Sequence, residues 1–129
     1  MEVKIDTREK FHVITILEPS LAANMTENFD TCLLPYLQYD VKNVVLNLRD
    51  IQSIDNAAAE RLVQLQQKFY ESNASFVICE LQKPVEEVLD KQNLLELINV
   101  TPTESEAGDI VQMEEIEREL MNGEFENDI

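Results

Sequence analysis

Residues 44–62 read VVLNLRDIQSIDNAAAERL, and this stretch combines the two periodicities that determine the fold. Its first part belongs to Lys42–Leu48 (KNVVLNL), a run of apolar and β-branched residues that predicts a strand buried on both faces. A polar loop, Arg49–Asp55, follows, and Asn56–Ser72 then has the spacing of an amphipathic helix. A buried strand that leads through a short loop into a helix is typical of α/β proteins with a parallel sheet.

The same alternation of strands and helices extends to both sides of this stretch. Proline residues mark several ends, because proline removes a backbone donor from a strand or helix interior. The predicted elements are, in order, an edge strand at Val3–Ile5, a strand at Phe11–Leu17, a helix at Ala22–Leu37 that Pro35 should end or kink near Leu34, the strand and helix above, a strand at Ser75–Leu81, a helix with Pro84 in its first turn, a strand at Leu97–Val100 and a last helix after Thr103. We therefore predict one α/β domain with a central, mostly parallel sheet of four to five strands and about four helices.

The last helix is expected to begin at a capping box formed by Thr103 and Glu106. Its inward face is predicted to consist of Ala107, Ile110, Met113, Ile116 and Leu120, with the helix ending near Gly123. This places a single domain at residues 1–121 and an acidic, disordered tail at residues 122–129. The acidic segment either seeks a basic partner surface or covers the sheet and keeps the protein soluble, and we favour the second interpretation.

Composition narrows the class of protein. The chain has 129 residues and a net charge of −16, which repels phosphates and argues against nucleic acid as a partner. Residues 104–129 hold ten acids and one base, a net −9, whereas residues 1–103 hold 16 acids and nine bases, a net −7. Only two glycines occur, which argues against a glycine-rich phosphate loop.

The compartment is expected to be the cytoplasm. Cys32 and Cys79 lie in apolar runs without metal-ligand or redox spacing, which predicts buried thiols in a reducing environment. The N-terminal segment has no signal-peptide pattern, and no apolar run is long enough to insert into a membrane.

The residues that usually carry catalysis are scarce. His12 is the only histidine and lies within a predicted strand, so we expect it to be structural. No zinc or calcium ligand spacing occurs, and the carboxylates fall mainly on solvated helix faces. The sequence therefore predicts a protein that is not an enzyme, with no cofactor and no metal.

The loop before the central helix is the candidate site. Asp55 or Asn56 can cap the helix by accepting its free amides, and the carboxyl ends of parallel strands are where α/β proteins commonly bind partners. The alanines that follow would leave a flat, low surface beside Asp55, Glu60 and Arg61. Flat surfaces of this kind favour protein docking over small-molecule binding.

At this loop the sequence resembles the STAS family, named for sulfate transporters and anti-sigma factor antagonists. The resemblance covers residues 11–116 and rests on four segments in order: FHVITIL leading to Ser20–Leu21, VVLNLRDIQSID, SFVICEL and INVTPTESEA. It implies a bacterial regulator of transcription that acts by partner switching. Family members bind an anti-sigma factor that is also a serine kinase, and phosphorylation of the second serine in the family's D-S-S-G motif breaks that complex.

The sequence departs from the family pattern at the switch. The motif stands here as Ile54–Asp55–Asn56–Ala57–Ala58–Ala59, so the phospho-acceptor position is Ala57, which has no hydroxyl group, and Ala58 takes the glycine position. A second acidic position of the family is replaced by Ala22, and Ser53 is a weak substitute acceptor. The resemblance implies partner binding by residues 53–61 without the usual phospho-switch, through Ser53, Asp55, Asn56, Ala57, Ala58, Glu60 and Arg61.

Two further hypotheses stay open. Some STAS domains are thought to sense a nucleotide or a lipid, and others are accessory subunits of a transport ATPase. In the docking hypothesis the partner would be an anti-sigma factor with serine kinase activity, and in the accessory-subunit hypothesis it would be an ATPase subunit. The sequence does not decide between them, nor does it predict the oligomeric state.

Overall fold

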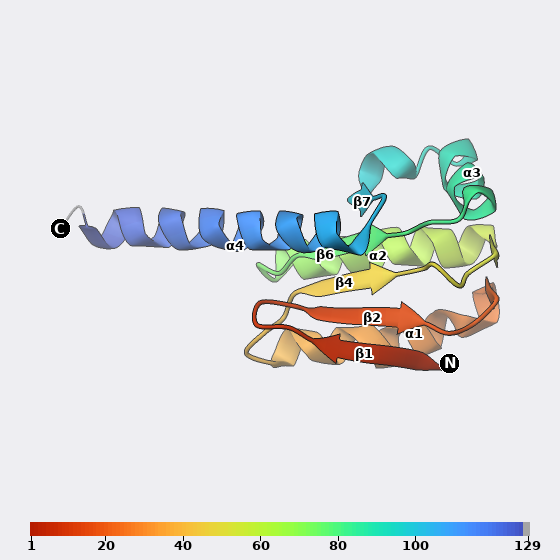
Figure 1. The fold of residues 1–129 in the computed structure, drawn as a ribbon, viewed down its shortest axis with the longest axis horizontal. Coiled ribbons are helices and arrows are strands. Elements are labelled where there is room, and N and C mark those ends of the chain that lie inside the picture. Colours follow the sequence, from red (N-terminus) through yellow and green to blue (C-terminus); the bar gives the residue numbers. More distant parts are fainter. Residues whose placement is uncertain (128–129) are drawn as a thin grey trace.

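A five-stranded sheet forms the centre of the computed structural model, which describes the backbone of residues 1–127 and the side chains of residues 1–121. The strand order is β1-β2-β4-β6-β7 (Figure 1). The strands are β1 (Val3–Thr7), β2 (His12–Ile16), β4 (Val44–Asn47), β6 (Phe76–Cys79) and β7 (Val100–Thr101). Only β1 runs antiparallel, beside β2, and the other neighbours are parallel. The predicted α/β fold with a mostly parallel sheet is confirmed.

The three central strands are buried on both faces, as their apolar runs predict. All residues of β2, β4 and β6 are buried, and they pair in register, with Ile14 opposite Leu46 and Leu46 opposite Ile78. His12 is buried within β2, where its ring nitrogens contact Thr7 Oγ1 at 3.1 Å and the Val41 carbonyl oxygen at 3.0 Å. The single histidine is therefore structural.

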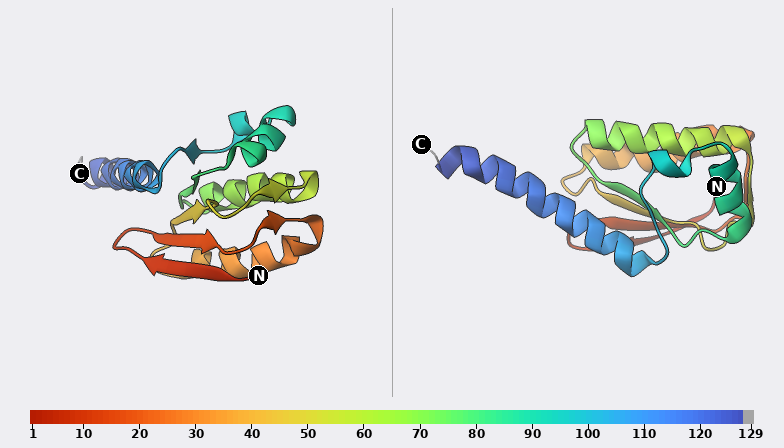
Figure 2. Two further views of the ribbon diagram at one scale, coloured as in Figure 1. Left: turned by 45° about the vertical axis from the view of Figure 1, so that its right-hand side comes forward. Right: turned by 90° about the horizontal axis from the view of Figure 1, so that it is seen from above.

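Helices cover both faces of the sheet (Figure 2). Helices α1 (Thr26–Leu33) and α2 (Asn56–Glu71) pack on one face and enclose the larger hydrophobic core, which includes Phe29, Leu62 and Phe69. Helix α4 (Glu104–Asn127) covers the other face, where a smaller core contains Phe11, Val45 and Val111. Gly108 allows this close packing, because a Cβ atom there would come within 2.9 Å of the Phe11 ring.

The other predicted boundaries agree in most places. A 3₁₀ helix, η2 (Leu34–Gln38), follows α1 where Pro35 ends the α-helical hydrogen bonding. Helix α3 (Lys83–Lys91) carries proline in its first turn, as expected. The strand predicted at Leu97–Val100 is displaced, because residues 95–97 form the 3₁₀ helix η3 (Leu95–Leu97) before β7 begins.

A second, two-stranded sheet lies in the loops that the sequence describes only as polar connections. Strand β3 (Ser20–Leu21) pairs in parallel with β5 (Ser53–Ile54), and the 3₁₀ helix η1 (Ala23–Met25) follows β3 directly. Ile51 and Ile54 from this loop are buried in the larger core. Two-residue strands have too few residues for a recognisable alternation, which explains why the sequence does not predict them.

The orientation of α4 differs from the prediction after its first two turns. Ala107 and Val111 are buried and Ile110 packs beside them, but Met113, Ile116 and Leu120 are exposed rather than inward. The face of α4 that meets the sheet makes polar contacts there instead of apolar ones. The prediction that Met113, Ile116 and Leu120 face inward is therefore wrong.

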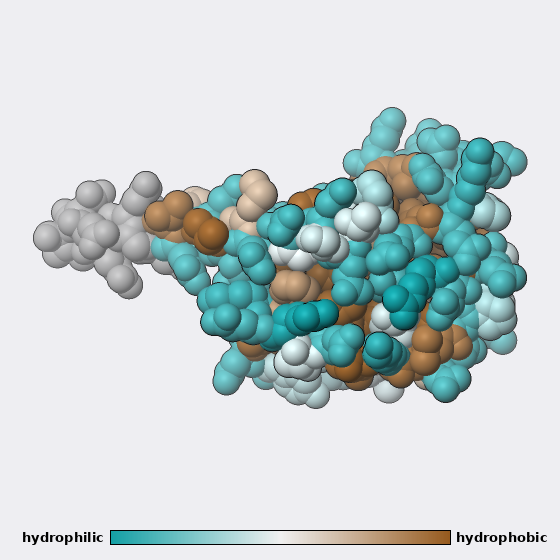
Figure 3. Space-filling model, viewed as in Figure 1, coloured by the Kyte–Doolittle hydropathy of each residue, from teal (hydrophilic) through white to brown (hydrophobic). Residues whose placement is uncertain are grey.

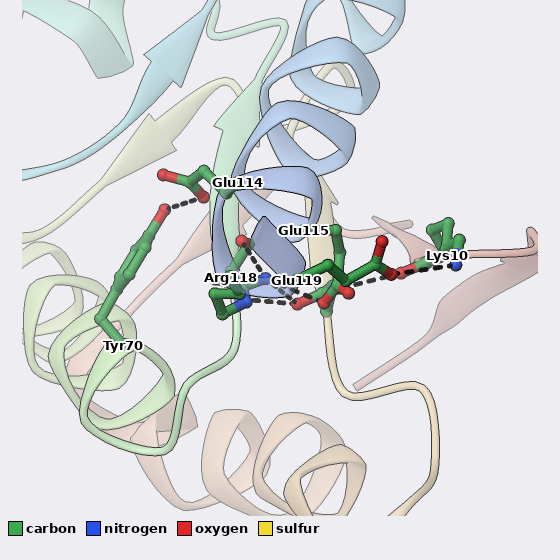
Figure 4. A network of polar contacts seen from close by, with 8 residues as sticks. Lys10, Tyr70, Glu114, Glu115, Arg118 and Glu119 are labelled. Carbon is green, nitrogen blue, oxygen red and sulfur yellow. Dashed lines mark hydrogen bonds and ion pairs between the residues drawn. The ribbon is translucent and has the colours of Figure 1, made fainter. Parts of the chain in front are cut away.

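The inward contacts of α4 form a network with the amino ends of the central strands (Figure 4). Arg118 donates to Asn43 Oδ1 at 3.2 Å, to Ser75 Oγ at 3.0 Å and to Glu115 at 2.9 Å. Tyr70 donates to Glu114 at 2.8 Å, and burial together with this carboxylate raises the pKa of Tyr70 to about 12. These distant polar partners fix which face of the helix meets the sheet.

The ends of α4 partly match the sequence prediction. Thr103 Oγ1 accepts the Glu106 N–H at 3.1 Å, which confirms that half of the capping box. The backbone helix continues to Asn127 rather than ending near Gly123, since one glycine costs a helix only about 1 kcal/mol. It thus crosses the predicted boundary between residues 121 and 122, and residues 128–129 lie outside the described part. The division into a domain and a disordered tail stays a prediction.

Candidate functional site

Asp55 organises the start of helix α2. It is the N-cap residue, and its Oδ1 accepts the Ala58 N–H at 2.9 Å. Its Oδ2 accepts the Ala23 N–H of η1 at 2.7 Å, and its own N–H donates to the Leu21 carbonyl at 3.0 Å. The one carboxylate therefore joins two segments that are 32 residues apart in the sequence.

The small β3–β5 sheet supports this arrangement. Ser20 pairs with Ser53 and Leu21 with Ile54, and the Gln52 N–H donates to the Pro19 carbonyl at 2.7 Å. This short pairing satisfies backbone N–H and C=O groups of both segments. It therefore restrains the loop in front of α2. The loop and the helix start form one supported edge at the carboxyl end of β4.

Five predicted site residues share an exposed surface at this edge: Ser53, Asp55, Asn56, Ala57 and Glu60. We call these five residues the opening-turn surface. Asn56 also accepts a hydrogen bond from Gln92, at the end of α3, at 2.6 Å. The surface is not covered by another part of the described chain, which the docking hypothesis requires.

Two predicted contact residues do not belong to this surface. Ala58 has no exposed area and, with Ala59, packs in the larger core, because the second and third alanines of the turn face inward. The prediction that Ala58 contacts a partner is therefore wrong, and the flat apolar patch reduces to Ala57. Arg61 is only partly exposed, because it forms a bidentate ion pair with Asp30 of α1 at 2.8 and 2.6 Å.

Helix η1 adds exposed residues beside the opening turn that the sequence does not predict. Ala23 and Asn24 are exposed and lie beside the opening turn, because Asp55 accepts the Ala23 N–H. Asp30 was also missed, although it holds Arg61 in place. The only sequence signal for η1 was its position after Ser20–Leu21, and a hydrogen bond to a backbone amide leaves no mark on side-chain composition.

A polar cluster lies nearby, at the carboxyl ends of β4 and β6. The buried Asn47 donates to Glu80 at 3.1 Å and to Glu104 at 3.0 Å, which ties the start of α4 to the sheet. Burial, followed by the Glu80 and Glu104 carboxylates, raises the pKa of Cys79 to about 12. A thiol with so high a pKa is a poor nucleophile at neutral pH.

Other features that would suggest chemistry are few. Among the side chains of residues 1–121, no three of His, Cys, Asp or Glu are grouped so that they could hold a metal ion. A cleft of about 610 Å³ lies between the β1–β2 turn and α4, lined by Arg8, Lys10, Phe11 and Gln112 among others, and it includes no residue of the opening-turn surface. Within the described part, no helix combines the length and apolar character needed to cross a bilayer.

Several solved structures have the same fold as this chain. A Thermotoga maritima protein assigned as an anti-sigma factor antagonist is 21% identical, with 85% of this chain and 94% of that chain covered and a TM-score of 0.72. SpoIIAA of Bacillus in its unphosphorylated form is 15% identical, with coverages of 86% and 96% and a TM-score of 0.67. A variant of RsbS from Moorella thermoacetica is 16% identical, with coverages of 87% and 96% and a TM-score of 0.71. At these identities the similarity establishes the fold.

The family itself follows from the sequence match. No curated protein matches the chain. The family described as STAS domain matches residues 2–107, which is most of the chain and includes the opening turn and the start of α4. The chain therefore belongs to the STAS domain family.

Proposed function

We propose that this protein is a non-enzymatic regulator that binds another protein through the opening-turn surface. The observation that carries the proposal is the double role of Asp55, which caps α2 and anchors η1 while its residue stays exposed. A surface held rigid before binding loses little conformational entropy when a partner docks. The exposed residues around it are small or polar, and they offer a shallow contact area.

The partner that the family suggests is an anti-sigma factor of the serine-kinase type. Structures similar to this one include anti-sigma factor antagonists, and the net charge of −16 opposes binding to nucleic acid. A subunit of a transport ATPase could use the same docking surface, and the identity of the captured partner separates these two cases. A nucleotide or lipid sensor with its site at this turn has less support, because the cleft of about 610 Å³ lies beside α4 instead.

The usual phospho-switch would be lost in this chain. Ala57 occupies the phospho-acceptor position and is exposed, but it has no hydroxyl group to accept a phosphate. Ser53 is exposed on β5 and is the substitute acceptor that the sequence offers. We infer that phosphorylation at position 57 does not regulate the complex. Its formation then depends on protein concentration or on a different signal.

The direct test adds charge to the opening turn. The Ala57→Asp variant places a carboxylate at the docking surface, and affinity for a purified anti-sigma factor encoded near this gene in the host genome is measured by isothermal titration calorimetry. We expect about tenfold weaker binding or more, because an unpaired charge must be desolvated at the interface. The matched control is Gln67→Glu, which makes the same change in charge at an exposed position further along α2.

A second variant tests the missing switch. Ala57→Ser restores a hydroxyl group at an exposed position in the first turn of α2. With the kinase-type partner and ATP, we expect this variant to gain one phosphate in mass spectrometry while the unmodified chain gains none at position 57. In the calorimetric test, equal affinities of the Ala57→Asp and Gln67→Glu variants would show that the partner does not bind the opening-turn surface. Phosphorylation of the natural chain at Ser53 would assign the switch to that residue.

A further inference from the structure

The second half of α4 turns its polar side towards the protein and its apolar side towards solvent. Glu114, Glu115 and Arg118 make the contacts with Tyr70, Asn43 and Ser75. Because Arg118 donates to Asn43 and Ser75 on the sheet as well as to Glu115 on its own helix, rotating the helix to bury its apolar side would break the part-buried contacts with the sheet. The orientation is therefore fixed by specific contacts.

The apolar side forms a row along the exposed helix face. Met113, Ile116 and Leu120 are 60%, 56% and 60% exposed, and Met121 beside them is 64% exposed. Spacings of three and four residues place the first three on the face opposite to Val111 and Arg118. Figure 3 shows hydrophobic side chains on the part of α4 that extends beyond the sheet, where neighbouring elements do not cover them. A row of this length and spacing is the anchor pattern of a helix that binds in a groove.

The charges beside this row limit what can cover it. Exposed carboxylates on the same helix are Glu106, Asp109 and Glu117, whereas Glu119 forms an ion pair with Lys10 of the body at 3.7 Å. Between Glu104 and Met121 the only base is Arg118, which contacts the body of the protein. Two copies of this face would bring like charges together, and anionic lipids or nucleic acid would be repelled. A protein surface with basic residues complements the face in charge.

We propose that α4 is a second docking element, and that its Met113–Ile116–Leu120 row binds an apolar groove flanked by lysine or arginine on a different protein. The apolar row would supply the contact area, while the flanking carboxylates would pair with the basic rim. This inference does not depend on the opening-turn surface, since the two involve different helices.

Site-specific photo-cross-linking in the native host identifies what covers the row. The full-length chain carries a photoreactive phenylalanine at Ile116, or at the exposed Glu71 as a positional control. We expect a cross-link from position 116 alone, to a peptide of another protein that has apolar residues flanked by lysine or arginine. A cross-link to a second copy of this chain, to lipid, or to an acidic peptide would overturn the proposal, as would no cross-link at all.

Reconstitution with the purified partner then tests the chemistry. Leu120→Gln should weaken binding about tenfold or more, since it removes an apolar anchor while changing only an exposed side chain. Raising the salt concentration should weaken binding to the natural chain, and the double variant Asp109→Asn, Glu117→Gln, at two exposed carboxylates beside the row, should lose most of this salt dependence. Affinity that is insensitive to both changes would refute the docking mode. Ala57→Asp should leave this affinity unchanged, which separates the test from that of the proposed function.

Discussion

Each oxygen of the Asp55 carboxylate has a separate structural task. One oxygen satisfies an amide at the start of α2, and the other satisfies the Ala23 amide at the start of η1. Helix starts leave several N–H groups without partners inside the helix, so a carboxylate that reaches two such segments stabilises both. The same residue that the family motif identifies as functional is therefore also part of the local fold.

Asp55→Ala tests this double cap. We expect the free energy of unfolding to fall by about 1–2 kcal/mol, because both amides lose their acceptor at once. The measurement is urea unfolding followed by circular dichroism, with Glu60→Ala as an exposed neighbour that should change stability by less than about 0.5 kcal/mol. A loss no greater than that of Glu60→Ala would contradict the shared cap.

Cys79 gives a second prediction for a single residue. Burial and two neighbouring carboxylates raise its pKa to about 12, and burial also raises the pKa of Cys32. Since the thiolate is the reactive form, we expect Cys79 to resist a disulfide reagent such as DTNB at about pH 8 in the folded protein and to react in urea. Cys32, which is only partly buried, should react before Cys79. Equal, rapid reaction of both thiols in the folded protein would contradict this.

Among the elements, α4 depends on a titratable contact. Hydrogen bonding from Asn43, assisted by Arg118, lowers the pKa of Glu115 below its usual 4.5, although burial opposes the shift. A carboxyl whose pKa is lower in the folded state stabilises the protein above its ordinary pKa, and this stabilisation is lost as pH falls through the lowered value.

Comparison of the natural chain with Glu115→Gln measures this effect. The variant should be less stable near neutral pH, and the difference in free energy of unfolding should shrink as pH falls from neutral to below the usual pKa of 4.5 and the natural carboxylate is protonated. Glu117→Gln, an exposed substitution on the same helix, controls for the loss of one negative charge. A difference that stays constant across this range would show that the Glu115 contact does not stabilise the carboxylate.

The elements also show where sequence patterns succeed and where they stop. The β-branched runs of β2, β4 and β6 identify buried strands because burial on both faces favours apolar residues at most positions, although His12, Thr15 and Asn47 are buried polar exceptions. The same logic fails for α4, since Glu114 and Arg118 contact polar partners in remote segments. Apolar periodicity predicts which residues prefer burial, but it cannot detect a helix whose inward contacts are hydrogen bonds.

The sequence predicts the candidate site only in part. The N-cap at Asp55 and the exposure of Asn56 and Ala57 follow from the helix pattern that begins there. The burial of Ala58 does not, because alanine is compatible with both surface and core. The contact with Ala23 depends on the β3–β5 pairing, which brings together two loops that are distant in the sequence.

For the whole molecule, the net charge of −16 should oppose compaction. Salt screens repulsion among exposed charges, so raising ionic strength from about 0.01 M to 0.15 M should increase the melting temperature. If screening contributes about 1 kcal/mol, the increase should be roughly 3–6 °C. Calorimetry in sodium chloride, with sucrose as an uncharged additive for comparison, measures it. An unchanged or lower melting temperature in salt would show that repulsion does not limit stability.

The antiparallel course of α4 along β4 and β6 has a geometric consequence. The helix starts at the sheet end where Asp55 lies and extends past the opposite end (Figure 1). A protein seated on the first turn of α2 and another seated on the far part of α4 would not compete for area. With both bound, the domain would act as a rigid spacer, and the length of a parallel sheet would set the separation of two molecules that never touch one another.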